Sequence, residues 1–210
     1  SGAGLQLSYF RFETDDADRL DLDPGAGNNV IRSLVTHPAT LNQAFDSLSA
    51  SAAHSIQVDQ VDLTGWMSFG DGCAVSIHGL GGLRFGRLEQ EFRSEFQILG
   101  RTTVDTNIDF EGVGPQLGVL SVVEVGGGLM AYGQGLASFL VGKSSGDYRQ
   151  ENEFQGVLAE TGFDKTRIVP VLELEMGLGW QNEWLRATLG YTIISWRNLV
   201  TTNGFIQSVQ

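Results

Sequence analysis

The chain contains few cysteines and few basic residues. A single cysteine, Cys73, excludes an internal disulfide and a zinc site built from cysteines. Lysine occurs only at Lys143 and Lys165, and 13 Lys plus Arg against 25 Asp plus Glu give a formal charge of −12. Because nucleic-acid phosphates require a basic surface, this balance argues against a nucleic-acid partner.

Long apolar runs and nucleotide-binding motifs are also absent. No stretch of 18 consecutive apolar residues occurs, which excludes a helical membrane span. The chain has 28 glycines among 210 residues, yet neither a Gly-x-Gly-x-x-Gly nor a phosphate-loop pattern. We therefore interpret the glycines as sites of tight turns and close strand approach.

Two-residue alternation dominates the sequence. It is clearest from Val169 to Trp180, where leucine, methionine and tryptophan occupy one face and Glu173, Glu175 and glycines occupy the other. Residues 184–196 repeat the pattern after a turn of three residues. The same periodicity predicts seven antiparallel strands, near 5–13, 56–69, 74–90, 108–123, 129–142, 169–180 and 184–196.

The predicted connections alternate between short and long. Short turns join some pairs of strands, at Gly70 to Cys73, Gly126 to Gly128 and Gln181 to Glu183. Long polar segments join the others, at 14–55, 91–107 and 143–164. This sorting is typical of a transmembrane β-barrel with short periplasmic turns and long extracellular loops.

We therefore predict an all-β fold, an antiparallel up-and-down transmembrane β-barrel of about eight strands, as one domain over residues 1–210. The first extracellular loop, 14–55, is predicted to contain a short helix from about Pro38 to Ala52. Bacterial single-chain barrels have even strand numbers. We expect the descending eighth strand to be missing, or only begun, in residues 201–210.

Aromatic residues gather near the predicted strand ends, as in the girdles of membrane barrels. The alternative, that aromatic residues simply favour strands, stays open. The predicted interface girdle consists of Trp66, Phe69, Trp180, Trp184 and Trp196.

The polar face of each strand defines the predicted lumen. Gln60, Thr64, Ser76 and Thr192 accompany the charged positions on that face. The candidate pore-lining residues are Asp62, His78, Arg84, Glu173, Glu175, Arg186 and Thr188.

Two states of this lumen are compatible with the sequence. Unmatched acidic side chains would give an open channel a preference for cations. An eight-stranded interior can equally be filled by its own side chains, which would plug the barrel. The face of the strand at 108–123 is ambiguous, because Asp109 and Glu111 share it with Pro115, Leu117 and Val119.

We expect no enzymatic activity, metal or cofactor. Glu173 and Glu175 resemble a hydrolase pair, but no third catalytic group or substrate cleft accompanies them. His37, His54 and His78 lie on different elements without metal-ligand spacing.

Five segments resemble a known family in their order along the chain. They begin at Gly81, Phe110, Gly135, Val169 and Leu189, and read GGLRF, FEGVGPQLG, GLASFLVGK, VPVLELE and LGY through WRN. They look like the Legionella-type major outer membrane protein family of pore-forming proteins, over roughly residues 58–207. The resemblance implies a bacterial outer-membrane barrel with a pore or structural role and no catalytic residues. It also implies a closing strand after the Asn-Gly-Phe-Ile stretch at 203–206.

The expected partners are membrane lipid, lipopolysaccharide, and small solutes or ions, with the oligomeric state left open. A soluble lipocalin-like barrel with an apolar ligand inside is the alternative. Its exterior would carry many lysines and glutamates, whereas the polar face here consists mainly of glycine, threonine and serine.

Overall fold

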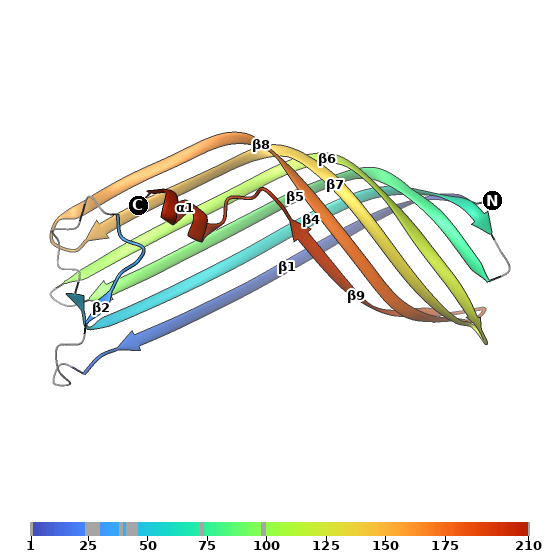
Figure 1. The fold of residues 1–210 in the computed structure, drawn as a ribbon, viewed down its shortest axis with the longest axis horizontal. Helices are drawn as coiled ribbons and strands as arrows, with labels where there is room; N and C mark the ends of the chain where they lie inside the picture. The colour runs from blue at the N-terminus through green and yellow to red at the C-terminus, as the bar shows by residue number, and fades with distance from the viewer. Residues whose placement is uncertain are drawn as a thin grey trace.

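The computed structural model describes residues 2–23, 30–37, 40, 46–71, 74–97 and 100–209. Seven long strands form one antiparallel sheet in the order β1-β4-β5-β6-β7-β8-β9, curled into a half-barrel (Figure 1). The strands of this sheet are β1 (Ala3–Asp21), β4 (Ser49–Asp71), β5 (Val75–Gln97), β6 (Arg101–Gly126), β7 (Leu129–Asn152), β8 (Gly156–Gln181) and β9 (Arg186–Trp196).

The remaining elements are short. Strands β2 (Ile31–Arg32) and β3 (Asp46–Ser47) pair with each other, and helix α1 (Thr202–Val209) ends the described chain. No helix in the described part of the chain is long and apolar enough to cross a membrane. Every long strand pairs with the next long strand in sequence, so the predicted up-and-down antiparallel topology is confirmed.

The strands are longer than the alternation predicted, and the predicted long loops are mostly extensions of the sheet. Strand β5 continues to Gln97 and β6 begins at Arg101, so the predicted loop at 91–107 is almost entirely strand. Likewise only residues 153–155 separate β7 from β8. The predicted boundaries of the first loop, 14–55, are wrong, because residues 13–21 pair with residues 49–57. The polar sequence of these segments therefore belongs to strands of the sheet and not to loops.

The ends of that first loop and of the chain also differ from the predictions. The chain is extended from Asp46 onward, so a helix reaching Ala52 is wrong; most of 38–45 lies outside the described residues. Residues 202–209 form α1 and not the start of an eighth strand. The Phe205 amide donates to the Thr201 carbonyl oxygen at 2.8 Å, and Phe205 and Ile206 are buried against the sheet.

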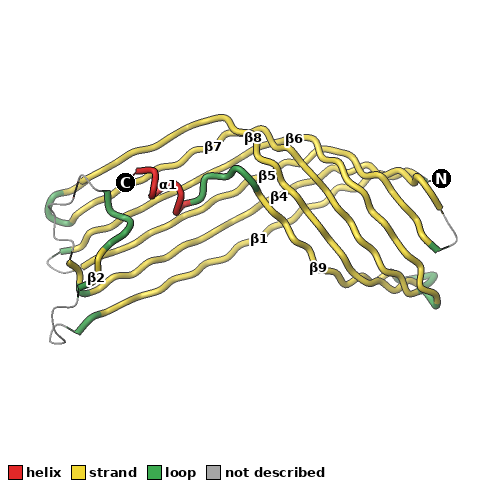
Figure 2. The backbone as a smooth tube through the Cα atoms, in the orientation of Figure 1, coloured by secondary structure: helices red, strands yellow, loops and turns green. Residues whose placement is uncertain are grey.

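Strands β6, β7 and β8 bend sharply near their middles (Figure 2). Glycines permit a close approach of β6 and β7 in this region. A Cβ atom on Gly114 would overlap the carbonyl oxygen of Phe139, and one on Gly142 would overlap the carbonyl oxygen of Glu111. The regular pairing of β6 with β7 is interrupted between Val113 and Gln116, beside Pro115.

Candidate functional site

The convex face of the half-barrel carries an apolar band. Leu5, Leu117 and Leu189 are 73, 70 and 83% exposed, which is far outside the range of core leucines. Such an area of exposed aliphatic side chains is typical of a surface that contacts lipid. Further exposed members of the band are Leu7, Leu63, Leu83, Phe85, Val113, Val119, Phe139, Val141, Ile168, Leu172, Leu174, Met176, Leu178, Tyr191 and Ile193.

A row of alternating charges ends this band at the end of the sheet where the strands continue into the predicted long loops. We call these continuations the strand extensions. The members of the row lie directly opposite one another on five successive strands, in the order Arg11, Asp59, Arg87, Glu111 and Lys143. We call these five residues the boundary row. Opposite charges across neighbouring strands stabilise the pairing, and the alternation places every acidic member between two cations.

Beyond the boundary row the convex face becomes acidic. The next row contains four carboxylates and no cation, and the row after it contains three more. The boundary cations reach toward the first of these rows: Arg11 contacts Glu13 at 3.0 Å, Arg87 contacts Glu89, and Lys143 contacts Asp164 at 3.4 Å. The acidic rows consist of Glu13, Glu89, Asp109 and Asp164, then Asp15, Glu91 and Asp147.

Asp109 is exposed, but desolvation by its neighbours, followed by repulsion from Glu89, raises its pKa. A folded-state pKa above the unfolded value means that ionisation of Asp109 destabilises the fold. Asp109→Asn is therefore expected to raise the unfolding temperature at pH 7. The gain should disappear as the pH falls through the raised pKa to below about 3.9, the ordinary value for Asp, where wild-type Asp109 is also neutral.

Heat-dependent gel migration at pH 7 and pH 3 measures this effect in detergent-refolded protein. Asp164→Asn is the matched control, because Asp164 lies in the same row but contacts Lys143. An equal gain at both pH values, or a loss at pH 7, would contradict the prediction.

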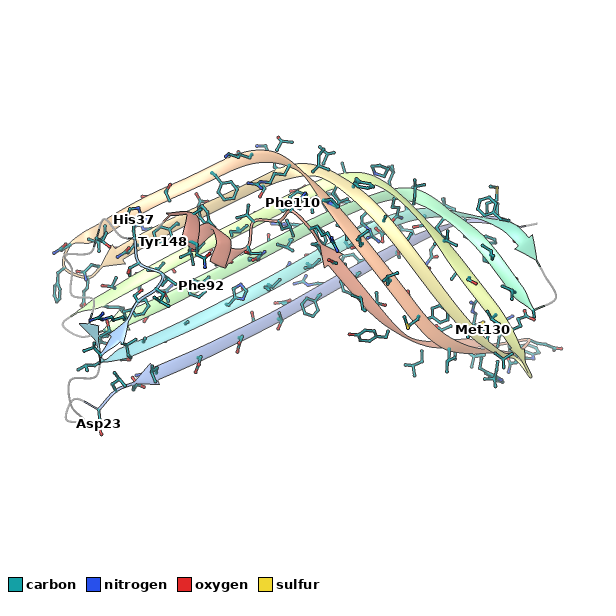
Figure 3. The ribbon with its side chains drawn as sticks, viewed as in Figure 1. Asp23, His37, Phe92, Phe110, Met130 and Tyr148 are labelled. Atoms are coloured by element: carbon teal, nitrogen blue, oxygen red, sulfur yellow. The ribbon has the colours of Figure 1, made fainter. Side chains whose placement is uncertain are left out.

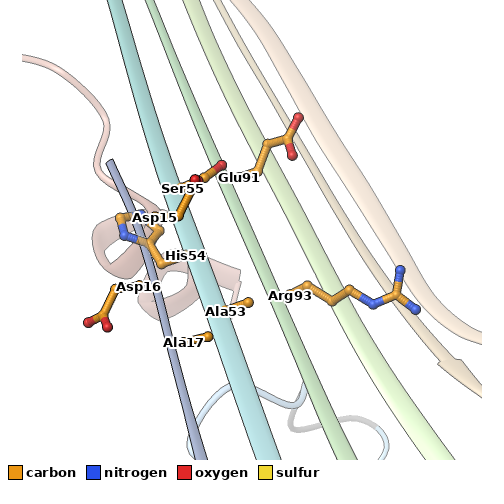
Figure 4. A pocket seen from close by; sticks show the side chains of 8 residues that line it. All are labelled: Asp15, Asp16, Ala17, Ala53, His54, Ser55, Glu91 and Arg93. Atoms are coloured by element: carbon orange, nitrogen blue, oxygen red, sulfur yellow. The ribbon is translucent and has the colours of Figure 1, made fainter. Parts of the chain in front are cut away.

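A shallow hollow of about 470 Å³ lies on the strand extensions, near the β1 edge of the sheet. Ala17 and Ala53 lie side by side on neighbouring strands, and Asp15, Glu91 and Arg93 surround them (Figure 4). Small side chains on β1 and β4 leave this space between longer charged ones.

The concave face carries an ion-paired arginine at the level of the apolar band. Arg84 on β5 is fully buried and donates through Nε and Nη2 to Asp62 on β4, at 2.7 and 2.8 Å. The same Nη2 donates to Glu173 on β8 at 2.7 Å. Strands β6 and β7 separate β5 from β8 in the sheet, so Arg84 spans the concave side. Gly114, directly opposite Arg84 on β6, leaves room for it.

Beside this bridge lies a cavity of about 300 Å³, which we call the lumen cavity. Its polar lining includes Asp62, Glu173 and Glu175, and Tyr132 donates to Glu175 at 2.8 Å. Apolar side chains from four strands are interleaved with these polar groups. The cavity is lined by Gln6, Ser8, Phe10, Gln60, Asp62, Thr64, Leu80, Gln134, Leu136, Glu173, Glu175, Thr192 and Ile194.

Apolar side chains fill the concave face above the lumen cavity, toward the strand extensions. One cluster joins Phe110, Leu140, Val169 and Val171, and Trp196 packs against it. A second cluster holds α1 in place, with Phe205 and Ile206 against Val104, Ile108 and Tyr148. In Figure 3, Tyr148 and Phe92 lie near α1, Phe110 lies near the bend, and Met130 lies at the opposite end.

Polar contacts hold residues 33–37 and Thr40 against the same part of the concave face. The Tyr148 hydroxyl donates to the Val35 carbonyl oxygen at 2.9 Å, and the His37 amide donates to Gln150 Oε1 at 2.8 Å. Burial raises the pKa of Tyr148 to about 12, so its hydroxyl stays protonated and remains a donor at neutral pH. Sequence reasoning missed Tyr148 and Gln150, because both lie in a segment predicted as loop.

The structure brings together four of the seven predicted lumen residues. Asp62, Arg84, Glu173 and Glu175 meet in or beside the lumen cavity. His78 lies on the same face nearer the short turns, with its ring 5.5 Å from that of Trp66. Arg186 and Thr188 lie at the start of β9, are exposed, and are not among the residues that line the cavity.

The predicted aromatic girdle divides between the two faces. Phe69, Trp180 and Trp184 are 67, 40 and 89% exposed near the short turns. Including Trp66 and Trp196 in an outward girdle is wrong. Trp66 follows the concave face of β4 and meets His78, and Trp196 packs edge to face on buried Phe110, with ring centroids 6.2 Å apart. Position near a strand end does not determine which face a residue occupies, whereas the register does.

Comparison with known families agrees with this architecture. A family model described as the Legionella pneumophila major outer membrane protein precursor matches residues 1–210. The chain belongs to this outer membrane protein family. Comparisons with curated proteins and with solved structures gave no match. Membership places the protein in the bacterial outer membrane.

Membership in the major outer membrane protein family also contradicts the soluble lipocalin-like alternative. A lipocalin-like barrel would turn its apolar face inward around a ligand. Here the aliphatic side chains of β8, including Leu174 and Leu178, are 57 and 66% exposed, while Glu173 and Glu175 face the concave side.

Proposed function

We propose that the protein is a passive outer-membrane pore of narrow bore that prefers cations. The observation that carries this proposal is the charge of the lumen cavity. Three carboxylates, Asp62, Glu173 and Glu175, face it, and Arg84 is the cation that pairs with two of them. The excess of two negative charges at the level of the lipid-facing band would attract cations and repel anions.

The reversal potential in a salt gradient across a planar bilayer tests this proposal. Replacing both Glu173 and Glu175 with glutamine removes two lumen charges, so we expect the cation preference to fall several-fold. Glu160→Gln is the control, since Glu160 is exposed and lies opposite Arg149 in the strand register on the convex face. An unchanged reversal potential in the double variant would argue against selectivity at this site.

A second candidate function is that of a plugged envelope structural protein. The two apolar clusters and α1, which fill the concave face above the lumen cavity, favour it. A protein that shows heat-dependent migration but gives no conductance steps would support this candidate over the pore.

Lipid and lipopolysaccharide are the proposed membrane partners. The apolar band would contact acyl chains, and the boundary cations Arg11, Arg87 and Lys143 would lie at the depth of the phosphate-bearing headgroups. Small ions or solutes would be the passing ligands, with no catalytic step.

A further inference from the structure

We infer that the lumen cavity binds small organic cations that carry an ammonium group on a short apolar stem. This inference deepens the proposed pore by naming its solute class, and it rests on that proposal for transport. Binding itself requires only the cavity. Three features of the lining support it: the excess of carboxylates, an unpaired buried acceptor, and apolar side chains beside these polar groups.

The three carboxylates differ in their ion pairs. Arg84 forms ion pairs with Asp62 and Glu173, whose side chains are 11 and 13% exposed. Glu175 has no cation of its own among the ion pairs of the described residues, and it accepts one hydrogen bond from the neutral hydroxyl of Tyr132. A carboxylate has room for about four hydrogen bonds, so Glu175 can accept further donors from a ligand.

Gln60 adds an acceptor to the lining of the same cavity. It is 4% exposed, and its Nε2 donates to Asp62 Oδ2 at 2.9 Å. Its Oε1 is buried and meets no hydrogen-bond partner within the described chain. A buried acceptor without a donor is unfavourable, and an ammonium group supplies three donors and no acceptor. Gln60 and Glu175 therefore favour a donor-rich cation over an anion.

Apolar side chains alternate with the polar ones around the cavity: Phe10 lies beside Gln60, and Leu136 and Ile194 flank Glu173. Phe10, Leu80, Leu136 and Ile194 line the cavity from four different strands. A volume of about 300 Å³ corresponds to roughly ten water molecules, enough for an ammonium group with a stem of several carbons. An inorganic cation would make no contact with the apolar side chains, and a neutral apolar molecule would leave the carboxylates without a counter-charge.

Isothermal titration calorimetry with n-butylammonium chloride tests the inference on the full chain refolded in detergent. Sodium chloride and 1-butanol are the comparison ligands. Sodium supplies the positive charge without an apolar stem, and 1-butanol supplies the stem without the charge. We expect n-butylammonium to bind at least tenfold more tightly than either. Glu175→Gln should weaken n-butylammonium binding about tenfold, whereas Glu160→Gln on the convex face should leave it unchanged.

A second variant tests the site without changing charge. Thr192 lines the cavity from edge strand β9, and Thr192→Trp would fill the space, so we expect it to abolish n-butylammonium binding. Heat-dependent gel migration confirms that each variant is folded. Equal affinity for 1-butanol and n-butylammonium, or wild-type binding by both folded variants, would overturn the inference.

Bilayer recordings separate this inference from the proposed pore. Binding of n-butylammonium without conductance steps would support the site and overturn the pore. Cation-selective conductance without n-butylammonium binding would support the pore and overturn the site.

Discussion

Replacing Arg84 with methionine is expected to lower the free energy of unfolding by about 3–5 kcal/mol, the usual cost of removing one member of a buried ion pair. Arg84 is fully buried, and its loss would leave Asp62 and Glu173 without a cation on the concave face. Urea unfolding in detergent micelles, followed by tryptophan fluorescence, measures the change.

The compensating variant distinguishes electrostatics from packing. Adding Asp62→Asn and Glu173→Gln to Arg84→Met neutralises the whole cluster, so we expect most of the lost stability to return. Arg93→Met is the matched control, because Arg93 is 60% exposed and its surface pairs contribute little. If Arg84→Met were as stable as Arg93→Met, the bridge would not stabilise the fold.

Alanine at Gly114 is expected to destabilise the protein by about 3 kcal/mol, near the upper end for inserting a group into a packed site. The new Cβ atom would overlap the carbonyl oxygen of Phe139, which is backbone and cannot rotate away. The same urea titration measures the loss.

Gly133→Ala provides the control within the same sheet. The nearest heavy atom to a Cβ there is the carbonyl oxygen of Glu175, at 4.0 Å, so we expect a change of no more than about 0.5 kcal/mol. Equal effects at Gly114 and Gly133 would mean that close approach of β6 and β7 is not required.

Much of the sheet could be predicted from sequence because the two-residue period survives along each strand. The seven strands, their antiparallel order, and the grouping of Asp62, Arg84 and Glu173 on one face follow from that period alone. The two-residue period is clear wherever the convex face is apolar and the opposite face lines the concave interior. The contrast between apolar and polar positions is greatest there.

The two-residue period did not assign the faces of a strand where the polarity of one face changes along its length. On β6, Leu117 and Val119 belong to the apolar band, whereas Glu111 lies in the boundary row and Asp109 lies beyond it, all on the convex face. The sequence pattern made these residues seem incompatible, because one face was expected to have one polarity. The face of β6 becomes clear once the position of each residue along the strand is taken into account.

The filling of the concave face could not be read from the sequence either. Phe205 reaches Ile108 across about 100 positions of sequence, and Trp196 meets Phe110 in the same way. Contacts of this kind depend on the curl of the sheet, which the strand pattern does not encode.

The boundary row has a mechanical consequence for the protein as a whole: it would limit how far this end of the sheet can move into the hydrocarbon of the membrane. A shift of two residues along the strands, about 7 Å, would draw Arg11, Arg87 and Lys143 into hydrocarbon together with Asp59 and Glu111. The cost per basic side chain rises from about 0–1 kcal/mol near the interface to about 2–4 kcal/mol at the midplane. Because the charges lie at one level on five adjacent strands, they would together resist any displacement that carries them into hydrocarbon.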